Sequence, residues 1–320
     1  MLMEKRDSII LIAGPDDVGK RLDRVARVLL GSVPLSAVFR GLRTGDIRLN
    51  GRRARNDARL VPGDQILVAG PFAESVRSAA GDGGKASADP AELPTVLART
   101  RDLVFVSKPR GMLSHGPGGL DELAAGLVGP LPGISLAFRP APLHRLDRNT
   151  TGAVAISASI AGARAFSAAL RGGRIGKRYL ALVEGRIEGR EDWSAALERD
   201  GARRATFAPE PDGAPGRPAS TFVEPLANDA RHSLVIVSIG TGVTHQIRAH
   251  AALAGHPLAG DLKYGGKPFP GGYILHAWAL ELPEDLGCDA PVTVRAPLPA
   301  RVRASLAGRF GETVLAAFRI

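Results

Sequence analysis

Residues 143–152 of the chain read LHRLDRNTTG. A single carboxylate, Asp147, lies in this stretch among one histidine and two arginines. Residues 149–152 favour a turn and the apolar residues at 153–156 predict a short strand, so we expect Asp147 in a loop that enters a sheet. An aspartate in such a loop most often ties down a turn or pairs with an arginine. The stretch therefore needs support from elsewhere in the chain before it indicates catalysis.

The length and composition favour two globular units without disulfides. The chain has 320 residues, of which 44% are hydrophobic, enough for two buried cores. Its longest early apolar run, residues 9–13, is shorter than a membrane span of about 20 residues or a signal-peptide core of about 7 to 15. The single cysteine, Cys288, excludes internal disulfides and multi-cysteine zinc sites. We therefore expect a soluble, cytoplasmic protein that does not enter a membrane.

The charge of the chain favours a polyanionic partner. Its formal net charge is +10 and its isoelectric point is about 10.4. Residues 18–72 contain 11 Lys or Arg and 4 Asp, a net +7, whereas residues 1–17 carry −2 and residues 73–320 carry +5. Because this density exceeds what solubility requires, we predict that residues 18–72 bind nucleic acid.

The pattern within this basic region predicts two helices, a hairpin and a returning strand. Apolar residues recur at helical spacing over 22–29 and over 35–42, which predicts two short amphipathic helices. Gly45 is suited to end the second helix, Asn50-Gly51 is typical of a hairpin turn, and residues 63–68 predict a strand. The cations that this pattern leaves free to meet phosphates are Lys20, Arg21, Arg24, Arg40, Arg43, Arg48, Arg52 and Arg53.

The rest of the chain divides into a linker and a second domain. Residues 73–94 are mostly Ala, Gly, Ser, Asp and Pro, and we expect a flexible linker there. From 95 to 320, hydrophobic strands alternate with short helices, which predicts one further domain. Residues 1–17 remain as an N-terminal segment before the basic module of 18–72.

Two common kinds of site are excluded by their own chemistry. Residues 9–21 superficially match a nucleotide-binding phosphate loop, but Arg21 stands where a Ser or Thr would hold magnesium. His245, His250 and His256 lie close in the sequence, but the first two are five residues apart and splay around a helix. We therefore predict hydrogen-bonding histidines and no metal site.

Arg248 supports a functional interpretation of Asp147. Thr244 is suited to cap the start of a helix and Gly255 its end, which predicts a helix over 245–254. Arg248 then lies in the first turn, at the positive end of the helix dipole, where a cation is unfavourable. We therefore expect a specific anion beside Arg248, either a phosphate or Asp147.

Tyr179 gives a second support. It alternates with Lys177 on one face of a predicted strand. A tyrosine in a strand usually packs in a core. In a chain with only three Tyr and two Trp, however, Tyr179 is also one of the few side chains on which a base could stack.

Together these motifs resemble a known enzyme family. HRLDRNTTG resembles the central motif of the RluA-type pseudouridine synthases, which usually reads HRLD, two residues, then Thr-Ser-Gly. SKPRGMLSH, GKRYLALVEG, TGVTHQIRAH, AGHPLAGDLKYGG and LHAWALEL follow that family's order within residues 99–300, and residues 18–72 resemble the S4 RNA-binding module. Two positions depart from the family's pattern: Thr151 replaces a serine and keeps its hydroxyl, and Val243 replaces an arginine.

The resemblance implies an α+β fold with a mixed, mostly antiparallel sheet, and isomerisation of uridine to pseudouridine in RNA without a metal or cofactor. It implies that Asp147 is the catalytic aspartate, which acts on the ribose C1′ or on the base, and that Arg248 is its partner. Arg145 is implied to fill the gap left by the flipped uridine, and Tyr179 to lie beneath its base. An ionised carboxylate among cations suits this chemistry. The other substrate-binding residues that we expect are His144, Thr151, Lys177, His245, Gln246 and Lys108.

The RNA target and two other functions stay open at this point. The basic module and the HGPGG segment resemble the branch of the family that acts on large-subunit ribosomal RNA, with transfer RNA as the alternative. A non-catalytic RNA-binding factor would share the fold. A glycoside hydrolase would need two carboxylates about 5 to 10 Å apart, and only Asp261 or Glu184 could be named as the second. Nothing in the sequence requires a dimer, so we expect a monomer.

Overall fold

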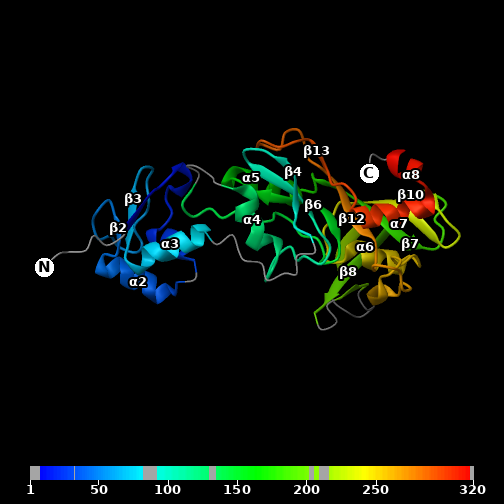
Figure 1. The fold of residues 1–320 in the computed structure, drawn as a ribbon, viewed down its shortest axis with the longest axis horizontal. Helices are drawn as coiled ribbons and strands as arrows, with labels where there is room; N and C mark the ends of the chain where they lie inside the picture. Colours follow the sequence, from blue (N-terminus) through cyan, green and yellow to red (C-terminus); the bar gives the residue numbers. More distant parts are fainter. Residues whose placement is uncertain are drawn as a thin grey trace. The chain divides into compact units, whose positions relative to one another are not determined.

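The computed structural model describes residues 8–31, 33–81, 92–129, 135–201, 205–208 and 216–317. The chain divides into two compact units (Figure 1). Unit 1 comprises Met1–Ser87 and Glu122–Ala141, and unit 2 comprises Ala88–Asp121 and Pro142–Ile320. The segment Glu122–Ala141, which the sequence alone assigned to the second domain, therefore belongs with the N-terminal residues.

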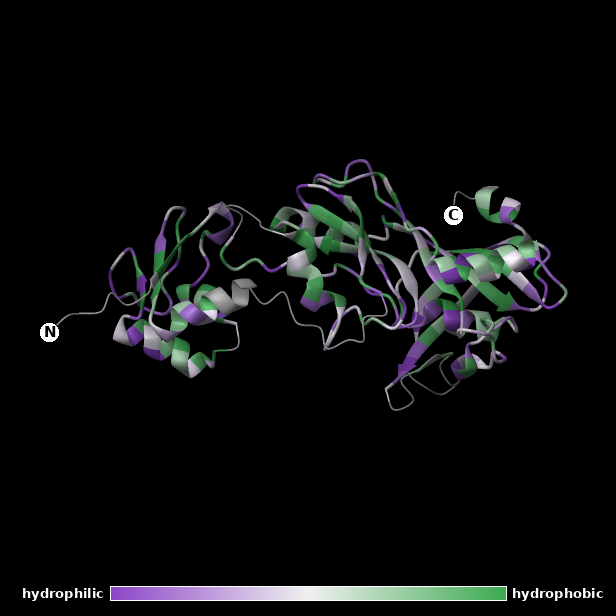
Figure 2. Cartoon of the chain, viewed as in Figure 1, coloured by the Kyte–Doolittle hydropathy of each residue, from purple (hydrophilic) through white to green (hydrophobic). Residues whose placement is uncertain are grey.

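Unit 1 contains a three-stranded antiparallel sheet and amphipathic helices. Its strands β1 (Ser8–Ile12), β2 (Ile47–Leu49) and β3 (Gln65–Ala69) lie in the order β1-β3-β2. Helix α2 (Leu35–Thr44) alternates between apolar and polar colours in Figure 2, and the apolar faces of α1 (Leu22–Leu30) and α2 are buried in one core. Strand β1 belongs to this sheet, so the unit includes residues before position 18, where the predicted basic module begins.

The turn signals of unit 1 are confirmed. Gly45 ends α2 in the left-handed conformation, at φ 85°. Asn50 and Gly51 have φ angles of 50° and 76°, and their neighbours Leu49 and Arg52 exchange two main-chain hydrogen bonds. This is the tight hairpin that an Asn-Gly pair favours.

The linker expected at residues 73–94 begins instead as a helix. Helix α3 covers Pro71–Gly81, and Phe72, Ala73 and Val76 are buried in the core of unit 1. This burial stabilises a helix whose composition is otherwise typical of a linker. Residues 82–91 of the expected linker lie outside the described residues.

A buried aspartate explains why the segment around Ser135 belongs to unit 1. Asp17 is 0% exposed and accepts hydrogen bonds from Ser135 Oγ at 2.5 Å and from the amide of Leu136 at 2.8 Å. Burial alone would raise the pKa of Asp17, but these hydrogen bonds hold it below the usual value. Leu136 and Ala137 also pack against the core of unit 1. The segment is therefore attached by both polar and apolar contacts.

Unit 2 is built on one large sheet. Among the described residues its strands follow the order β4-β5-β6-β12-β7-β11-β10-β8-β9, with β13 beside β12. Strands β6 and β12 are parallel and the other neighbours are antiparallel, which confirms the predicted α+β class with a mixed, mostly antiparallel sheet. The strands are β4 (Thr95–Arg99), β5 (Leu103–Lys108), β6 (Thr151–Ser157), β7 (Gly176–Glu184), β8 (Glu191–Asp200), β9 (Ala205–Phe207), β10 (Arg217–Asn228), β11 (His232–Ile239), β12 (Leu275–Glu281) and β13 (Thr293–Arg295).

Short helices pack around this sheet. Phe166 of α5 is buried with side chains of β5 and β6, and Leu306 of α7 is buried with side chains of β7 and β12. Among the described residues, no single helix is long and apolar enough to cross a membrane; α1 and α2 reach that length and hydropathy only as a pair bent by 118°. The helices of unit 2 are α5 (Ile160–Arg171), α6 (Gln246–Leu253), α7 (Ala300–Phe310), α8 (Glu312–Ala317) and the 3-10 turn η2 (Leu262–Tyr264). The 3-10 turn η1 (Pro15–Asp17) belongs to unit 1, and most of α4 (Leu120–Val128) lies in the segment assigned to unit 1.

One glycine brings the loop of Asp147 against the middle of the sheet. Gly152, at φ 116°, pairs with Ala277 where β6 runs parallel to β12. A Cβ at this position would lie 2.2 Å from the carbonyl oxygen of Ala277, so only glycine permits the close approach. Asp147 therefore lies in a loop that enters a central strand, as the sequence predicts.

Candidate active site

The loop that carries Asp147 is held on both sides. Lys108 Nζ donates to three main-chain carbonyls, among them that of Arg148 at 3.2 Å. Ser114 Oγ donates to the carbonyl of Leu146 at 3.0 Å and accepts from its amide at 2.9 Å. Asp147 thus lies between two anchored residues, which fixes the direction of its side chain.

Lys108 occupies a different place from the one expected. It was predicted to bind substrate, but it is 0% exposed and lies beneath the loop, with one carbonyl for each of its three ammonium protons. Burial lowers the pKa of Lys108 to about 8, although the charge of Asp147 works in the opposite direction. The side chain supports the loop.

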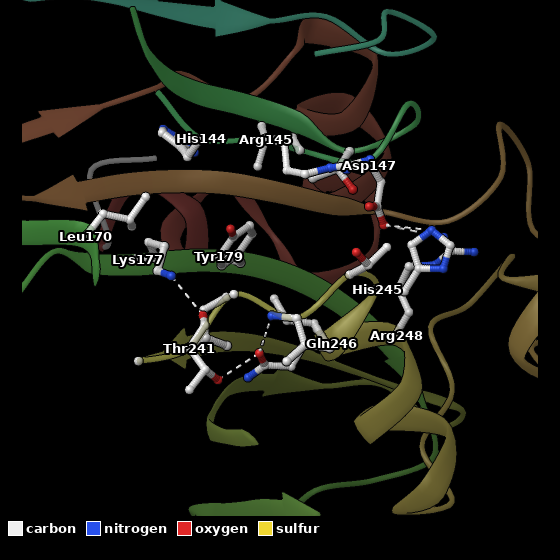
Figure 3. A pocket seen from close by; sticks show the side chains of 18 of the residues that line it. His144, Arg145, Asp147, Leu170, Lys177, Tyr179, Thr241, His245, Gln246 and Arg248 are labelled. Carbon is white, nitrogen blue, oxygen red and sulfur yellow. Dashed lines mark hydrogen bonds and ion pairs between the residues drawn. The ribbon is translucent and has the colours of Figure 1, made fainter. Parts of the chain in front are cut away.

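Two side chains approach one oxygen of Asp147. Arg248 Nη1 lies 3.4 Å and His245 Nε2 lies 3.7 Å from Asp147 Oδ2. Figure 3 shows Asp147 from the loop and both partners from the start of α6 pointing toward one another. Among the described residues, no group forms a hydrogen bond with Asp147 Oδ1. The predicted proximity of Asp147 and Arg248 is confirmed, and one carboxylate oxygen remains available.

Arg248 has a stronger partner that the sequence interpretation missed. Its Nε and Nη2 donate to the two carboxylate oxygens of Asp261 at 2.6 and 2.8 Å, and Asp261 is 2% exposed. The guanidinium also lies 4.8 and 4.7 Å from the ring centres of Tyr264 and Tyr273. Burial disfavours the charge, but the hydrogen bonds with Asp261 outweigh it and raise the pKa of Arg248. Arg248 is therefore a fixed cation beside Asp147.

The start of α6 differs from the sequence prediction. The helix begins at Gln246, and the residue before it is His245 in the left-handed conformation at φ 58°. Thr244 is not the cap, because His245 occupies the position before the first helical residue. The chain that enters the helix is secured by Gln246. Its Oε1 accepts hydrogen bonds from Thr241 Oγ1 at 2.8 Å and from the amide of Val243 at 3.1 Å. Gln246 and His245, both predicted to bind substrate, thus shape the loop before α6.

Strand β7 brings Tyr179 and Lys177 to the same cavity, as the alternation predicts. Tyr179 is 7% exposed, and its burial, with the charge of Asp147, raises the pKa of the phenol. The ring is therefore neutral. Lys177 Nζ donates to the carbonyl of Thr241 at 2.8 Å, which ties β7 to the loop before α6.

The cavity has the size and charge of a site for an anionic ligand. Its volume is about 670 Å³, within the usual range of about 300 to 1,000 Å³ for ligand pockets. Among the described residues that line it, Asp147 is the only acid. The cations that line it are Arg145, Arg171, Lys177, Arg217 and Arg248. Such a cavity can bind phosphates at its rim and present one carboxylate inside.

His144 lines the cavity as a neutral side chain. Its Nε2 accepts a hydrogen bond from the amide of Ala155 at 3.1 Å, and its ring stacks on Phe166 at 5.8 Å. Burial, with the nearby charge of Lys177, lowers the pKa of His144 to about 3. Since its Nε2 accepts, Nδ1 carries the proton.

Thr151 is buried and reaches His276 instead of the cavity. Thr151 Oγ1 lies 2.8 Å from His276 Nδ1, and His276 Nε2 lies 3.1 Å from the carbonyl oxygen of Ala296. The carbonyl can only accept, so His276 is protonated on Nε2 and Thr151 donates to Nδ1. Thr151, which stands where the family usually has a serine, thus connects β6 to β12 through its hydroxyl.

We expect this buried histidine to make the protein sensitive to acid. Burial lowers the pKa of His276 from 6.5 to about 4, so the unfolded chain binds the proton first as the pH falls. The free energy of unfolding should decrease from about pH 6.5 to pH 4, by about 3 kcal/mol from this group. Urea titrations of the wild type and His276→Gln across this range will test it. Equal pH slopes for the two proteins would contradict the expectation.

The other histidines of the 245–256 stretch make hydrogen bonds. In the part of the chain that the structure describes, no three His, Cys, Asp or Glu side chains lie close enough to hold a metal ion. His250 and His256 make hydrogen bonds with Thr221 Oγ1 and with the carbonyl oxygen of Glu184, both at 2.8 Å. The prediction of hydrogen-bonding histidines is therefore confirmed.

Comparisons with known proteins identify relatives of this chain. The family model for RNA pseudouridylate synthase matches residues 102–253. Ribosomal large subunit pseudouridine synthase C of Salmonella typhi is 31% identical to this chain, over 82% of the chain and 81% of that protein. The uncharacterized RNA pseudouridine synthase YlyB of Bacillus subtilis is 30% identical, over 92% of the chain and 95% of that protein.

A solved structure shares the fold of about two thirds of the chain. Human RNA pseudouridylate synthase domain containing 1 matches with a TM-score of 0.53 and 28% identity, over 66% of this chain and 87% of that one. These findings confirm the resemblance noted from the HRLD motif and its neighbours. The chain therefore belongs to the RNA pseudouridylate synthase family, whose enzymes isomerise uridine to pseudouridine in RNA.

Proposed function

We propose that this protein converts one or more uridines of large-subunit ribosomal RNA to pseudouridine, with Asp147 as the reacting group. The observation that carries the proposal concerns Asp147, the only acid among the described residues that line a cationic cavity; none of the described residues forms a hydrogen bond with its Oδ1. The name of the Salmonella typhi relative supports the ribosomal target. We infer further that the protein acts as a monomer in the cytoplasm; in support of the monomer, Asp147, Tyr179 and Arg248 line one cavity within a single chain.

In the proposed reaction the C1′–N1 bond of the uridine breaks and a C1′–C5 bond forms. The base loses the proton of C5 and gains one on N1, so the product is an isomer of the substrate. Asp147 Oδ1 acts on C1′ or on the base, while Arg248 keeps the other oxygen occupied. Flipping the base out of the RNA costs a few kcal/mol, which Arg145 offsets in the vacated space and Tyr179 offsets beneath the base.

The competing hydrolase function finds no support in this geometry. Glycoside hydrolysis needs a second carboxylate that can exchange a proton with the substrate. Asp261 is 2% exposed and both of its oxygens accept hydrogen bonds from Arg248. Glu184 does not line the cavity among the described residues. A single free carboxylate suits an isomerase better.

We propose that unit 1 supplies the RNA-binding surface, as an S4-like module. Of the cations predicted to bind RNA, Lys20 and Arg21 pair with Asp17 and Asp23. The remaining predicted cations are exposed: Arg24, Arg40, Arg43, Arg48, Arg52 and Arg53. Exposed arginines can exchange condensed counterions for phosphate contacts, which makes binding depend on salt.

The double variant Arg40→Gln/Arg43→Gln is expected to weaken RNA binding and its salt dependence. The slope of log K against log salt should become shallower by about 1.5, since each lost phosphate contact contributes about 0.7 to 0.9. Filter binding between low and physiological salt will measure it. The matched control is Arg186→Gln/Arg190→Gln, which removes two exposed arginines of unit 2 that pair with carboxylates. An equal change in both proteins would contradict an RNA-binding role for α2.

The experiment that tests the enzymatic proposal is a map of pseudouridines in total RNA from cells with and without the protein. We expect at least one pseudouridine of large-subunit ribosomal RNA to disappear. A change confined to transfer RNA would overturn the ribosomal target and keep the chemistry. If no position in any RNA changed, the enzymatic proposal itself would fail.

A further inference from the structure

We propose that His245 is a positioning residue for Asp147, and that Tyr264 sets its tautomer. In this arrangement the Nε2–H of His245 and the guanidinium of Arg248 together occupy Asp147 Oδ2, which leaves Oδ1 for the RNA. The inference rests on the proposed role of Asp147 and extends it to a chain of hydrogen bonds.

The tautomer of His245 follows from a count of donors and acceptors. The amide of Thr206 donates to Tyr264 Oη at 2.8 Å, and Tyr264 Oη lies 2.9 Å from His245 Nδ1. A main-chain amide can only donate, and among the described residues no other acceptor meets this hydroxyl. The hydroxyl proton therefore goes to His245 Nδ1, and the imidazole carries its own proton on Nε2.

This proton is directed at the carboxylate. His245 Nε2 lies 3.7 Å from Asp147 Oδ2, and the ring of His245 meets that of Tyr264 edge-on, at 5.7 Å and 88°. A distance of 3.7 Å is longer than a hydrogen bond, but catalytic hydrogen bonds often tighten only when the substrate is bound. The proton thus faces the carboxylate before RNA arrives.

The backbone supports the same interpretation. Among the described residues, only Asn50 and His245 are non-glycine residues with positive φ. Asn50 lies in a hairpin turn that requires this conformation, whereas His245 lies directly before a helix. Such a conformation persists where surrounding contacts maintain it, and such residues cluster at functional sites. Here the conformation directs the imidazole toward Asp147 and Tyr264 together.

His245 acts as a neutral donor. The pKa of the His245 imidazole lies below its usual value, chiefly because the ring is buried. The charges of Asp147 and Asp261 work in the opposite direction, whereas those of Arg248 and Lys263 lower the pKa further. A protonated imidazole would also carry a proton on Nδ1 and lose the hydrogen bond from Tyr264. The neutral form is therefore the one that keeps the whole chain of hydrogen bonds.

Two variants separate the imidazole from the hydroxyl that orients it. His245→Asn removes the ring and keeps a residue that tolerates the left-handed backbone. Tyr264→Phe removes only the hydroxyl. For both variants, we expect the kinetics of pseudouridine formation at one site of a substrate RNA to show a kcat lower by on the order of 10- to 100-fold and an unchanged KM, because the carboxylate is less well oriented. The control is His232→Asn, whose ring contacts Asp229 and does not line the cavity.

Nitrogen-15 NMR of histidine-labelled full-length protein tests the tautomer without reference to catalysis. The signal of His245, assigned by its loss in His245→Asn, should report an unprotonated Nδ1 in the wild type and a shift toward the other tautomer in Tyr264→Phe. A protonated Nδ1 in the wild type, or wild-type kcat in both variants, would overturn the inference. A wild-type protein that modifies no RNA would instead overturn the proposed function, and the NMR result would still decide on the hydrogen-bond chain.

Discussion

Replacing Asp147 by Asn is expected to lower the rate of pseudouridine formation by about 10⁴-fold or more while the fold and RNA binding persist. The amide keeps the shape of the carboxylate but is neither an effective nucleophile nor a base. Asp147 meets Arg248 and His245 only at 3.4 and 3.7 Å, so its charge contributes little to stability. Phosphate contacts supply most of the RNA affinity, and the substitution leaves them unchanged.

The measurement is the release of tritium from RNA that carries 5-³H-uridine, since the proton of C5 leaves during the reaction. Thermal unfolding and RNA binding of Asp147→Asn serve as controls in the same preparation. A non-catalytic RNA-binding factor makes the opposite prediction: the substitution would change neither the RNA nor the phenotype of cells. Wild-type tritium release by Asp147→Asn would therefore remove the catalytic proposal for this loop.

The residues that the sequence predicted well are those whose local pattern determines their place. Asp147 precedes a turn signal, Tyr179 alternates on a strand, and Arg248 lies at the start of a helix. The structure brings Asp147 and Arg248 within 3.4 Å and places Tyr179 on the same cavity. The Asn-Gly hairpin was predicted for the same reason, because it depends on residues close in the sequence, whereas the class of the sheet was expected from the family resemblance.

The residues that the sequence missed depend on contacts between distant segments. An arginine at a helix start requires an anion, and the prediction named Asp147 or a phosphate. The structure shows that Asp261 takes the bidentate position and Asp147 a weaker one. A bidentate partner for a buried arginine is the physical requirement that could have singled out Asp261. Lys108 was misplaced because sequence does not reveal whether a lysine is covered by a loop.

The domain boundaries show the same limit. The attachment of Glu122–Ala141 to unit 1 depends on Asp17, more than a hundred residues earlier in the chain. Charge and composition describe a stretch by itself and contain no information on such a pair. Helix α3 was missed because Phe72 lies just before the stretch whose composition suggested a linker.

Asp261→Ala is expected to destabilise unit 2 by about 3 to 5 kcal/mol, because it leaves a buried guanidinium without its carboxylate. Arg248 is 7% exposed, and its aromatic neighbours Tyr264 and Tyr273 cannot replace two charge-assisted hydrogen bonds. Arg248→Met leaves the charge of Asp261 buried and should cost a similar amount. Urea unfolding gives both values.

The double variant Asp261→Ala/Arg248→Met distinguishes the pair from its parts. With both charges gone, no buried ion remains unpaired, so the double variant should lose clearly less stability than the sum of the single variants. The exposed pair of Arg186 and Glu188 is the control, for which Arg186→Gln should change the free energy of unfolding by about 1 kcal/mol or less. Additive costs would mean that Asp261 and Arg248 stabilise the fold separately. The position of Arg248 beside Asp147 would then need another cause. Strong coupling between the two substitutions would instead mean that Asp261 holds the guanidinium of Arg248 beside Asp147.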